Sequence, residues 1–379
     1  MTQAPSAAPA LPPGSSKTPT ASVSTPPPTG EKPKASSPRV RRHYRPSLWP
    51  LYRQWLLHSK QPILAGPFRG ELGFEALYWL PFLAQLRYDG VAPERLIPIA
   101  RAGAACWYDV PHGLELYAMR TPQAMRIHNG EQAKRWGQLK QTHVTAWDRA
   151  VVQDAAQTMR LSSYLTLHPA WMYQLFMPFW AGRAGADLIE HHARFTELSP
   201  PPLPDGITLP EHFIAVKFYA RYTFPADPHV RQFVEQSLRQ MAQAHPVVLL
   251  DWDGHVDEHV GFAVPDIPNV TRLSTLLPSL LPETALAVQS AILARSMGFV
   301  GTYGGFAHLA LRFRRPVVSY YWEWGGIAFA HRTLSEHLAQ RMGVPFHCLR
   351  VLDLAMLQEV MPRVTMQPVA RAESQLQAV

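Results

Sequence analysis

Residues 298–320 read GFVGTYGGFAHLALRFRRPVVSY, and this stretch decides the fold class. The apolar run at 298–300 predicts a strand, and the glycine-rich segment 301–305 predicts the loop after it. Residues 306–313 are mostly apolar and predict a short helix, and residues 316–320 predict a second strand. A strand, a helix and a further strand in this order indicate a βαβ unit of a parallel sheet.

The rest of the chain continues this alternation. We expect strands at 62–65, 96–100, 213–218 and 247–251, and helices at 71–86, 227–244 and 284–296. The run LSPPPLPDG at 198–206 separates the two series, because consecutive prolines permit neither a helix nor a central strand. The sequence therefore predicts two doubly wound, Rossmann-like α/β domains that face a cleft.

Composition sets the domain boundaries. Residues 1–38 contain 10 of the 37 prolines and almost no bulky apolar side chains. Such a segment cannot bury enough surface to offset the entropy lost when it is ordered. We expect a disordered, basic Pro/Ser/Thr-rich tail at 1–45, α/β domains at 46–198 and 210–365, a linker at 199–209 and a flexible C-terminus at 366–379.

The net charge of +8 is concentrated in the N-terminal tail. Residues 1–45 hold seven basic residues and one acidic residue, so the rest of the chain is close to neutral. A nucleic-acid groove needs basic residues clustered on the folded body, and we expect no nucleic-acid partner. The arm RVRRHYR at 39–45 is either a solvated linker or a weak peripheral contact with anionic lipid headgroups, which attract basic segments by about 1 kcal/mol per charge.

The cellular compartment is inferred from three features. No apolar run approaches the ~18 residues of a membrane-spanning helix. The first residues, MTQAP, lack the basic-then-apolar layout of a signal peptide, so we expect no export. The two cysteines, Cys106 and Cys348, form neither a disulfide framework nor a zinc module. We expect a cytoplasmic protein, peripheral to the inner face of the membrane if the arm binds lipid.

The loop at 301–305 is the best candidate for an anion site. Thr302, Gly304 and Gly305 stand where a parallel strand ends and a helix begins. Glycines let backbone N–H groups approach an anion, and the helix N-terminus adds roughly half a positive charge. The alternative is that the glycines only make a tight turn. His308 lies one turn into the helix, where a lone histidine is more often a packed or capping residue than a ligand.

The segment GTYGGFAHLA at 301–310, followed by RPVV at 315–318, resembles the donor-site segment of GT-B glycosyltransferases. It is most similar to the heptosyltransferase-like, family 9-type pattern, whose loop reads roughly Gly-x-x-His-Leu-Ala before a Pro-Val strand. The match is good at 285–320 and only thematic elsewhere. The resemblance implies a GT-B fold in which 210–365 binds a nucleotide sugar and 46–198 faces the acceptor. It implies diphosphate contacts from Thr302, Gly304, Gly305 and His308.

An N-terminal counterpart is the segment GPFRGELGFE at 66–75, with Pro81 further on. It resembles the first-strand loop of the same superfamily, where Gly-Asp precedes a proline-containing helix and the Asp is the proposed base. Glu71 stands in that place, one methylene longer, and Glu75 is the second candidate. A carboxylate there suits the reaction, because the attacking hydroxyl must lose its proton. Both acids could instead only favour the positive helix N-terminus. The loop residues expected at the cleft are Arg69, Gly70 and Gly73.

Basic side chains in the second series could stabilise a leaving diphosphate. Lys217 and Arg221 follow its first strand, and the fork of an arginine can engage phosphate in two places. Either could also be a surface charge. The acids and histidines of 251–259 more often make a turn after a strand than a metal site, since their spacing dictates no geometry. We expect no metal and no cofactor apart from the donor substrate.

The leading hypothesis is a metal-independent GT-B glycosyltransferase. It would move a sugar from a nucleotide sugar to an acceptor hydroxyl in glycan or cell-surface polysaccharide biosynthesis. Attack assisted by Glu71 would invert the anomeric centre, and retention stays open. The alternatives are a nucleotide-sugar epimerase or hydrolase of the same fold, and a noncatalytic glycan- or partner-binding protein. Aromatic rings in 107–180 could stack on a glycan, although most are expected in the core: Trp107, Tyr108, Trp136, Trp147, Trp171 and Tyr173.

Overall fold

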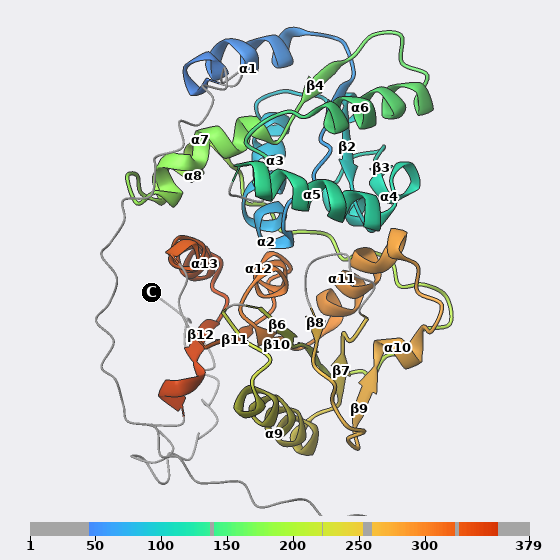
Figure 1. Cartoon of the computed structure of the whole chain (residues 1–379), viewed down its shortest axis with the longest axis vertical. Helices are drawn as coiled ribbons and strands as arrows, with labels where there is room; N and C mark the ends of the chain where they lie inside the picture. The colour runs from blue at the N-terminus through green and yellow to red at the C-terminus, as the bar shows by residue number, and fades with distance from the viewer. Residues whose placement is uncertain (1–44, 137–139, 222, 253–259, 323–325, 355–379) are drawn as a thin grey trace, which may run out of the picture. The chain divides into compact units, whose positions relative to one another are not determined.

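The computed structural model describes residues 45–136, 140–221, 223–252, 260–322 and 326–354 (Figure 1). The predicted disordered tail, except for Arg45, and the predicted flexible C-terminus at 366–379 lie outside these residues. Among the residues that are described, no helix is long and apolar enough to cross a membrane.

The first half of the described chain contains a four-stranded parallel sheet in the order β3-β2-β1-β4. Its strands are β1 (Ile63–Ala65), β2 (Leu96–Ala100), β3 (Leu114–Glu115) and β4 (Leu165–Leu167). The α-helices of this half are α1 (Trp49–His58), α2 (Leu72–Phe74), α3 (Leu80–Tyr88), α4 (Leu116–Met119), α5 (Pro122–Trp136), α6 (Ala146–Thr158), α7 (Ala170–Trp180) and α8 (Ala186–His192). Short turns are η1 (Pro46–Leu48), the π-helical η2 (Glu75–Trp79), η3 (Pro93–Arg95) and η4 (Ala104–Trp107).

The second half contains a six-stranded parallel sheet in the order β12-β11-β10-β5-β7-β9. Its strands are β5 (Ile214–Lys217), β7 (Val247–Leu249), β9 (Val270–Arg272), β10 (Gly298–Thr302), β11 (Val317–Tyr321) and β12 (Phe346–Arg350). A separate antiparallel pair joins β6 (Tyr219–Ala220) to β8 (Val260–Gly261). The helices are α9 (Pro228–Ala244), α10 (Leu273–Leu276), η5 (Pro282–Thr284), α11 (Ala285–Arg295), α12 (Gly305–Arg312) and α13 (Gly326–Met342).

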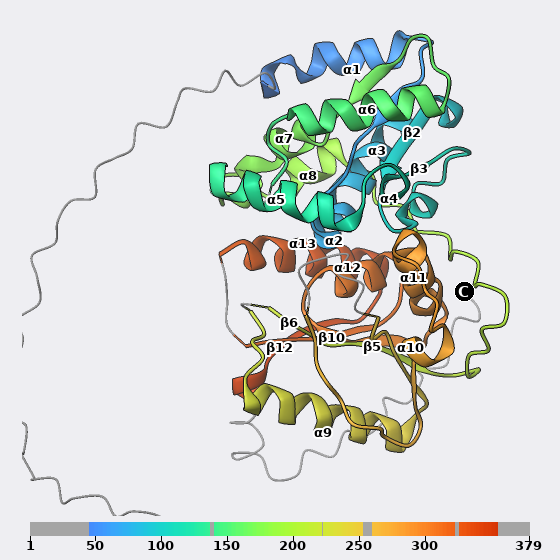
Figure 2. The ribbon, with the colours of Figure 1, turned by 45° about the vertical axis from the view of Figure 1, so that its right-hand side comes forward.

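Helices cover both faces of the six-stranded sheet. Figure 2 shows α9 on one face and α11, α12 and α13 on the other. Helix α9 buries Val230, Val234, Leu238 and Ala242, which recur every four residues and therefore form one apolar stripe. The central strand β5 is buried along Ala215 to Lys217, as expected of a parallel strand with helices on both sides. The predicted α/β fold class, with two parallel sheets, is confirmed.

The element positions agree closely with the sequence prediction. The predicted helix at 71–86 is present, although the π-helical turn η2 interrupts it between α2 and α3. The predicted helices at 227–244 and 284–296 correspond to α9 and α11. Between α8 and β5, where the proline-rich run lies, the chain carries no helix or strand. Aromatic rings of the 107–180 region are largely core, because Trp107, Tyr108, Trp171 and Tyr173 are buried.

Strand order fixes where a site can form in each sheet. The first strand of each series is internal, and the chain runs to one side of it and then returns to the other. In the first sheet this switch falls between β1 and β4, and in the second between β5 and β10. Open α/β sheets bind ligands outside the carboxyl ends of their strands at such switch points. The segments that leave these strand ends are therefore the places to examine.

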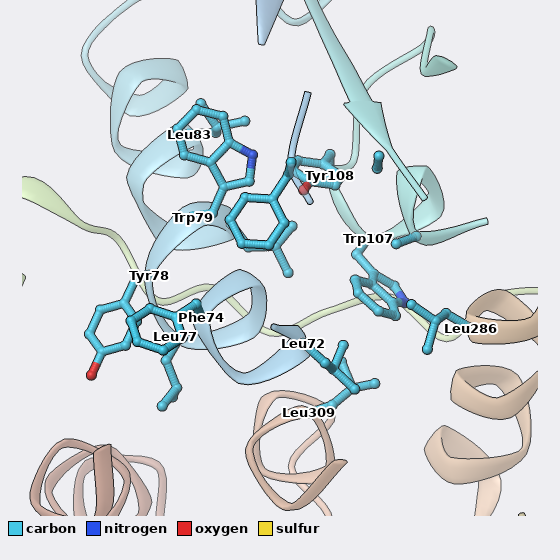
Figure 3. Close-up of a cluster of buried hydrophobic side chains, with 14 of the residues drawn as sticks. Leu72, Phe74, Leu77, Tyr78, Trp79, Leu83, Trp107, Tyr108, Leu286 and Leu309 are labelled. Carbon is cyan, nitrogen blue, oxygen red and sulfur yellow. The ribbon is translucent and has the colours of Figure 1, made fainter. Parts of the chain in front are cut away.

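The two halves share one hydrophobic core at α2 and α12. Figure 3 shows Leu72 of α2 beside Leu309 of α12, and Trp107 beside Leu286 of α11. All four side chains are buried in the same cluster. The first turn of α2 is consequently held against the second sheet's helices by apolar packing.

Candidate functional site

The loop after β1 carries the first half of the site. Gly66 has φ of +140° and a Cβ on it would lie 2.8 Å from the carbonyl oxygen of Ile99, so the turn requires glycine. The Gly66 amide donates to the carbonyl of Leu167, and the Phe68 amide donates to that of Ile99. These bonds attach the loop to both neighbouring strands at the switch point of the first sheet.

Arg69 attaches the loop after β1 to Asn129 and Asp148. Its guanidinium donates from Nε to Oδ1 of Asp148 at 3.0 Å and from Nη1 to Oδ1 of Asn129, and the side chain is 3% exposed. Burial opposes ionisation of Asp148, but His168 and Arg69 outweigh it and hold the pKa of that carboxyl far below its usual range. The structure thus places Arg69 in a buried ion pair under the predicted cleft loop.

Glu71 lies at the end of this loop and reaches the other half of the protein. It is the N-cap residue of α2, and its side chain is 39% exposed. Its carboxylate accepts from Nη2 of Arg221 at 2.9 Å and from Nη1 at 3.4 Å. Arg221 follows β6, just beyond the carboxyl end of β5, so this fork joins the two switch points. The structure brings together two of the predicted site residues that are 150 positions apart.

A second cation lies near Glu71. The ammonium of Lys140 stands over the rings of Phe74 at 5.3 Å and Trp180 at 5.0 Å. Burial lowers the pKa of Lys140, and the charge of Glu71 opposes that shift. The Arg221 guanidinium contacts the Glu71 carboxylate, and the Lys140 ammonium lies within electrostatic range of it, so two positive charges serve one negative charge and the location suits an anionic ligand.

A neutral histidine completes the surroundings of the pair. His331 of α13 forms a 2.7 Å hydrogen bond between Nδ1 and the hydroxyl of Tyr78, and its ring meets Phe74 edge-on at 4.7 Å. Burial holds the pKa of His331 well below 6.5, and the charges of His308, Lys140 and Arg221 lower it further. Sequence reasoning missed Lys140, His331 and Tyr78, because none of them belongs to a recognisable motif.

Helix α12 begins close to Glu71, and glycines make the approach possible. A Cβ on Gly305 would lie 2.7 Å from the Cβ of Leu72 and 3.0 Å from the amide nitrogen of Gly73. A Cβ on Gly73 would lie 3.2 Å from Cδ2 of His308. No side chain caps the start of α12. The N-termini of α2 and α12 therefore meet backbone to backbone, two residues from the Glu71 carboxylate.

Thr302, which is buried, and Gly304, which is partly buried, lie beside the segment after β5. Thr302 Oγ1 accepts from the amide of Tyr219 and donates to its carbonyl, both at 3.0 Å. A Cβ on Gly304 would lie 2.1 Å from the Tyr219 hydroxyl. Thr302 and Gly304 thus fix the segment that leads to Arg221.

Lys217 and His308 are also buried. Lys217 donates to the carbonyl of Leu250 at 2.7 Å and to Oε1 of Gln289 at 2.8 Å, and its ammonium stands 4.8 Å from the centre of the Phe306 ring. His308 hydrogen-bonds the hydroxyl of Ser335 through Nδ1, and burial lowers its pKa to about 3. These contacts support the scaffold beneath the exposed Glu71–Arg221 pair.

Glu75, the second candidate base, lies in the core. Its carboxylate accepts from Arg101 at 3.0 Å and from the Tyr108 hydroxyl at 2.6 Å, and both charged side chains are fully buried. Burial and the Glu75 charge raise the pKa of Tyr108 well above 10. Of the two acids, only Glu71 reaches the surface.

Gly70 precedes Glu71 in the loop after β1. A Cβ on Gly70 would lie 2.7 Å from the Tyr173 hydroxyl.

In the part of the chain that is described, no group of three or more acids, histidines or cysteines could hold a metal ion. Asp251 accepts from the amide and hydroxyl of Ser274 and faces Arg272 at 3.5 Å. Asp251 therefore binds the first turn of α10. The other acids and histidines of the 251–259 cluster, all within 253–259, lie outside the described residues.

Comparison with known proteins gives resemblances to solved structures. No protein-family model and no curated protein matches the chain. A glycosyl transferase family 9 structure from Veillonella parvula is 11% identical with a TM-score of 0.41, covering 82% of this chain and 92% of its own. Escherichia coli heptosyltransferase WaaC with ADP is 13% identical with a TM-score of 0.37, covering 71% and 90%. The same enzyme with ADP-2-deoxy-2-fluoro heptose is 14% identical with a TM-score of 0.34, and the match covers 74% of this chain and 99% of its own. The glycosyl transferase family 9 and heptosyltransferase structures agree with the resemblance of the motifs at 301–310 and 66–75.

Proposed function

We propose that this protein is a glycosyltransferase that moves a sugar from a nucleoside-diphosphate sugar to an acceptor hydroxyl. The observation that carries the proposal is the Glu71–Arg221 fork, which joins the switch points of two parallel sheets beside the uncapped start of α12. A carboxylate that can take a proton and a guanidinium that can hold a phosphate are the two groups this transfer needs. Here they are already in contact.

The donor diphosphate is assigned to Arg221 and Lys140. Both carry positive charge beside Glu71, and Arg221 can bind phosphate in two places. Leu72 and Gly73 cover the first residue of α12, so that helix contributes through its dipole rather than by direct contact in this conformation. Lys217, Thr302, Gly304, Gly305 and His308 then shape and support the donor site from within.

Glu71 is assigned as the general base. It removes the proton from the acceptor hydroxyl as the oxygen forms a bond to the anomeric carbon. The bond from that carbon to the diphosphate oxygen breaks, and the electron pair leaves with the nucleoside diphosphate. Arg221 and Lys140 stabilise the charge that develops on this leaving group. A single displacement of this kind inverts the anomeric centre.

Donor binding frees the base. In the described conformation Arg221 neutralises Glu71, and the phosphates of the donor compete for the same guanidinium. When the phosphates take Arg221, Glu71 is left with an unoccupied carboxylate next to the sugar. His331 is neutral and bonded to Tyr78, so it adds no positive charge to this location.

Calorimetric titration of the full chain with ADP, UDP, GDP, dTDP and CMP tests the donor site. ADP is the first ligand to use, because one WaaC structure holds it. We expect one nucleotide to bind, and Arg221→Gln to weaken that binding by about tenfold or more. The matched control is Arg239→Gln, which removes a guanidinium from an exposed ion pair with Glu235 on α9.

The other functions give different results. Absence of binding by any of the five nucleotides to the folded protein would favour a noncatalytic glycan- or partner-binding role. Donor breakdown at an equal rate with and without candidate acceptors would favour an epimerase or hydrolase. Product formation that needs an acceptor, such as a glycan with free hydroxyls, supports the transferase.

A further inference from the structure

A pocket of about 380 Å³ lies between α3, the turn η4, the segment 194–199 and the last residue of α12. Its inner wall is apolar and aromatic and includes four buried residues: Leu80, Trp107, Tyr108 and Leu198. Sites for small molecules usually have volumes of about 300–1,000 Å³ and mostly apolar walls. Neither Glu71 nor Arg221 lines this pocket, so it is separate from the candidate catalytic site.

The charged residues that line the pocket have a net positive charge. They are three arginines and two acids: Arg87, Arg194, Arg312, Asp109 and Glu197. The side chains of Asp109 and Glu197 are 79% and 61% exposed, so water screens their charges. Arg87 donates to the carboxylate of Asp109 at 2.8 Å. Among the residues that the structure describes, Arg194 and Arg312 pair with no carboxylate, and they supply the excess charge.

Arg312 places a charge inside the protein. It is the last residue of α12 and is only 1% exposed. Its guanidinium donates to the carbonyls of Ala76 and Thr196, both at 2.7 Å, and lies 5.5 Å from the centre of the Phe195 ring. Burial lowers the pKa of Arg312 to about 10, so the group keeps its charge at neutral pH. A buried charge with neutral partners is costly, and an anion in the pocket provides the counter-charge.

Arg194 is the accessible cation of the pocket. It is exposed, and its guanidinium carbon lies 3.7 Å from the centre of the Tyr88 ring. A guanidinium over a ring uses its face and keeps the N–H groups at its edge for an anion. Arg312 bonds the carbonyl of Thr196, two residues after Arg194, so both cations adjoin the same wall.

We propose that this pocket binds a small organic anion, with a carboxylate or phosphate group at Arg194 and an apolar body against the inner wall. The fork of Arg194 matches both anionic groups, and the buried charge of Arg312 attracts them from within the protein. Inorganic anions are poorer ligands, because they make no use of the apolar wall. The proposal does not rest on the glycosyltransferase assignment.

Calorimetric titration of the full chain with benzoate and with phenyl phosphate tests the proposal and separates carboxylates from phosphate esters. Benzamide is the neutral match of benzoate, and inorganic phosphate lacks the apolar body. We expect at least one of the two organic anions to bind with a Kd of about 1 mM or less. Benzamide and inorganic phosphate should bind about tenfold more weakly or less tightly still.

Two variants test the two parts of the pocket. Arg194→Gln removes the accessible charge from an exposed position and should weaken binding of the organic anion by about tenfold or more. Ala84→Leu adds volume at a partly exposed position of α3 that lines the pocket, and it should also weaken binding by about tenfold or more. Circular dichroism and thermal unfolding check that each variant is folded.

The controls locate the anion. Arg239→Gln removes an exposed guanidinium from α9, and Arg221→Gln removes the cation of the candidate donor site. Both should bind the organic anion as wild type does. Absence of binding by both organic anions at up to about 10 mM overturns the proposal, as does equal binding of benzoate and benzamide. Binding that Arg221→Gln abolishes and Arg194→Gln leaves unchanged also overturns it, because the anion then occupies the Glu71–Arg221 site.

Discussion

Replacement of Glu71 by Gln is the sharpest test of the proposed site. The substitution keeps the size of the side chain and lets it still accept a hydrogen bond from Arg221, but it removes the negative charge and the ability to take a proton. The Glu71 side chain is 39% exposed, and the side chain of its partner Arg221 is 20% exposed. The stability of the fold should therefore depend little on the charge of Glu71, whereas the rate of the proposed transfer should depend on it strongly.

The geometry predicts three magnitudes, of which the change in kcat and the change in donor affinity have opposite directions. Loss of a positioned general base lowers kcat by about 10²–10⁴-fold. Loss of a partly exposed ion pair costs only about 0.2–1 kcal/mol of stability. Because the same pair competes with donor phosphates, its loss should tighten donor binding by a factor of about 1.4 to 5. A slower enzyme that binds its donor as well as or better than wild type is a combination that misfolding cannot produce.

The assay measures initial rates of sugar transfer and the donor affinity by calorimetry on the same preparations. Glu235→Gln is the matched control, since it removes the carboxylate of an exposed Arg239 pair at 2.7 Å. Its rate and donor affinity should equal those of wild type. If Glu71→Gln retains a transfer rate within about threefold of wild type, Glu71 is not the base and the assignment fails.

Four further outcomes are expected. Gly305→Ala should destabilise the fold by about 1–3 kcal/mol in urea denaturation, because its Cβ would lie 2.7 Å from the Cβ of Leu72 and 3.0 Å from the amide nitrogen of Gly73. Glu75→Gln should cost about 3–5 kcal/mol in the same experiment, since it leaves a fully buried guanidinium without its counter-charge. Stability should fall as pH decreases from about 6.5 towards 3, because His308 takes up a proton in the unfolded chain but not in the folded one, where burial lowers its pKa to about 3. His308→Gln should reduce this dependence of the free energy of unfolding on pH. Transfer should persist in EDTA, since Arg221 and Lys140 supply the positive charge, and loss of activity that magnesium restores would contradict this.

The sequence predicted the fold well because its signals were local. The βαβ unit of 298–320 carries apolar strands, a glycine loop and a short helix in one continuous stretch, and the structure has β10, α12 and β11 there. Asp227 caps the predicted helix that became α9, and its carboxylate accepts from the amide of His229. Local chemistry of this kind is visible without any knowledge of distant contacts.

The site could be predicted only in part, because its contacts are long-range. The sequence predicts both Glu71 and Arg221 as site residues, but nothing in it indicates that they form an ion pair. Lys140 and His331 reach the same place from a loop and a helix that carry no motif. Glu75 is predicted as a second base but lies in the core. Its partner Arg101 follows another strand, and the burial of the pair depends on tertiary packing that the sequence does not reveal.

The glycines near α12 had two interpretations that the sequence could not separate. Their missing side chains could admit a phosphate or could admit another part of the protein. The structure uses the space at Gly305 for Leu72 and at Gly304 for the Tyr219 hydroxyl. Which interpretation applies depends on how close the two halves come, and that is decided by side chains far away in the chain.

The Glu71–Arg221 fork has a consequence for the kinetics of the reaction. In the proposed mechanism, an acceptor that arrives while Arg221 holds the carboxylate meets a base that is already occupied and gains nothing from it. The proposal therefore requires the donor to bind before the acceptor reacts, and the nucleoside diphosphate to leave before the fork closes again. Initial-velocity and product-inhibition measurements should accordingly give a compulsory order, with the nucleoside diphosphate competitive against the donor alone.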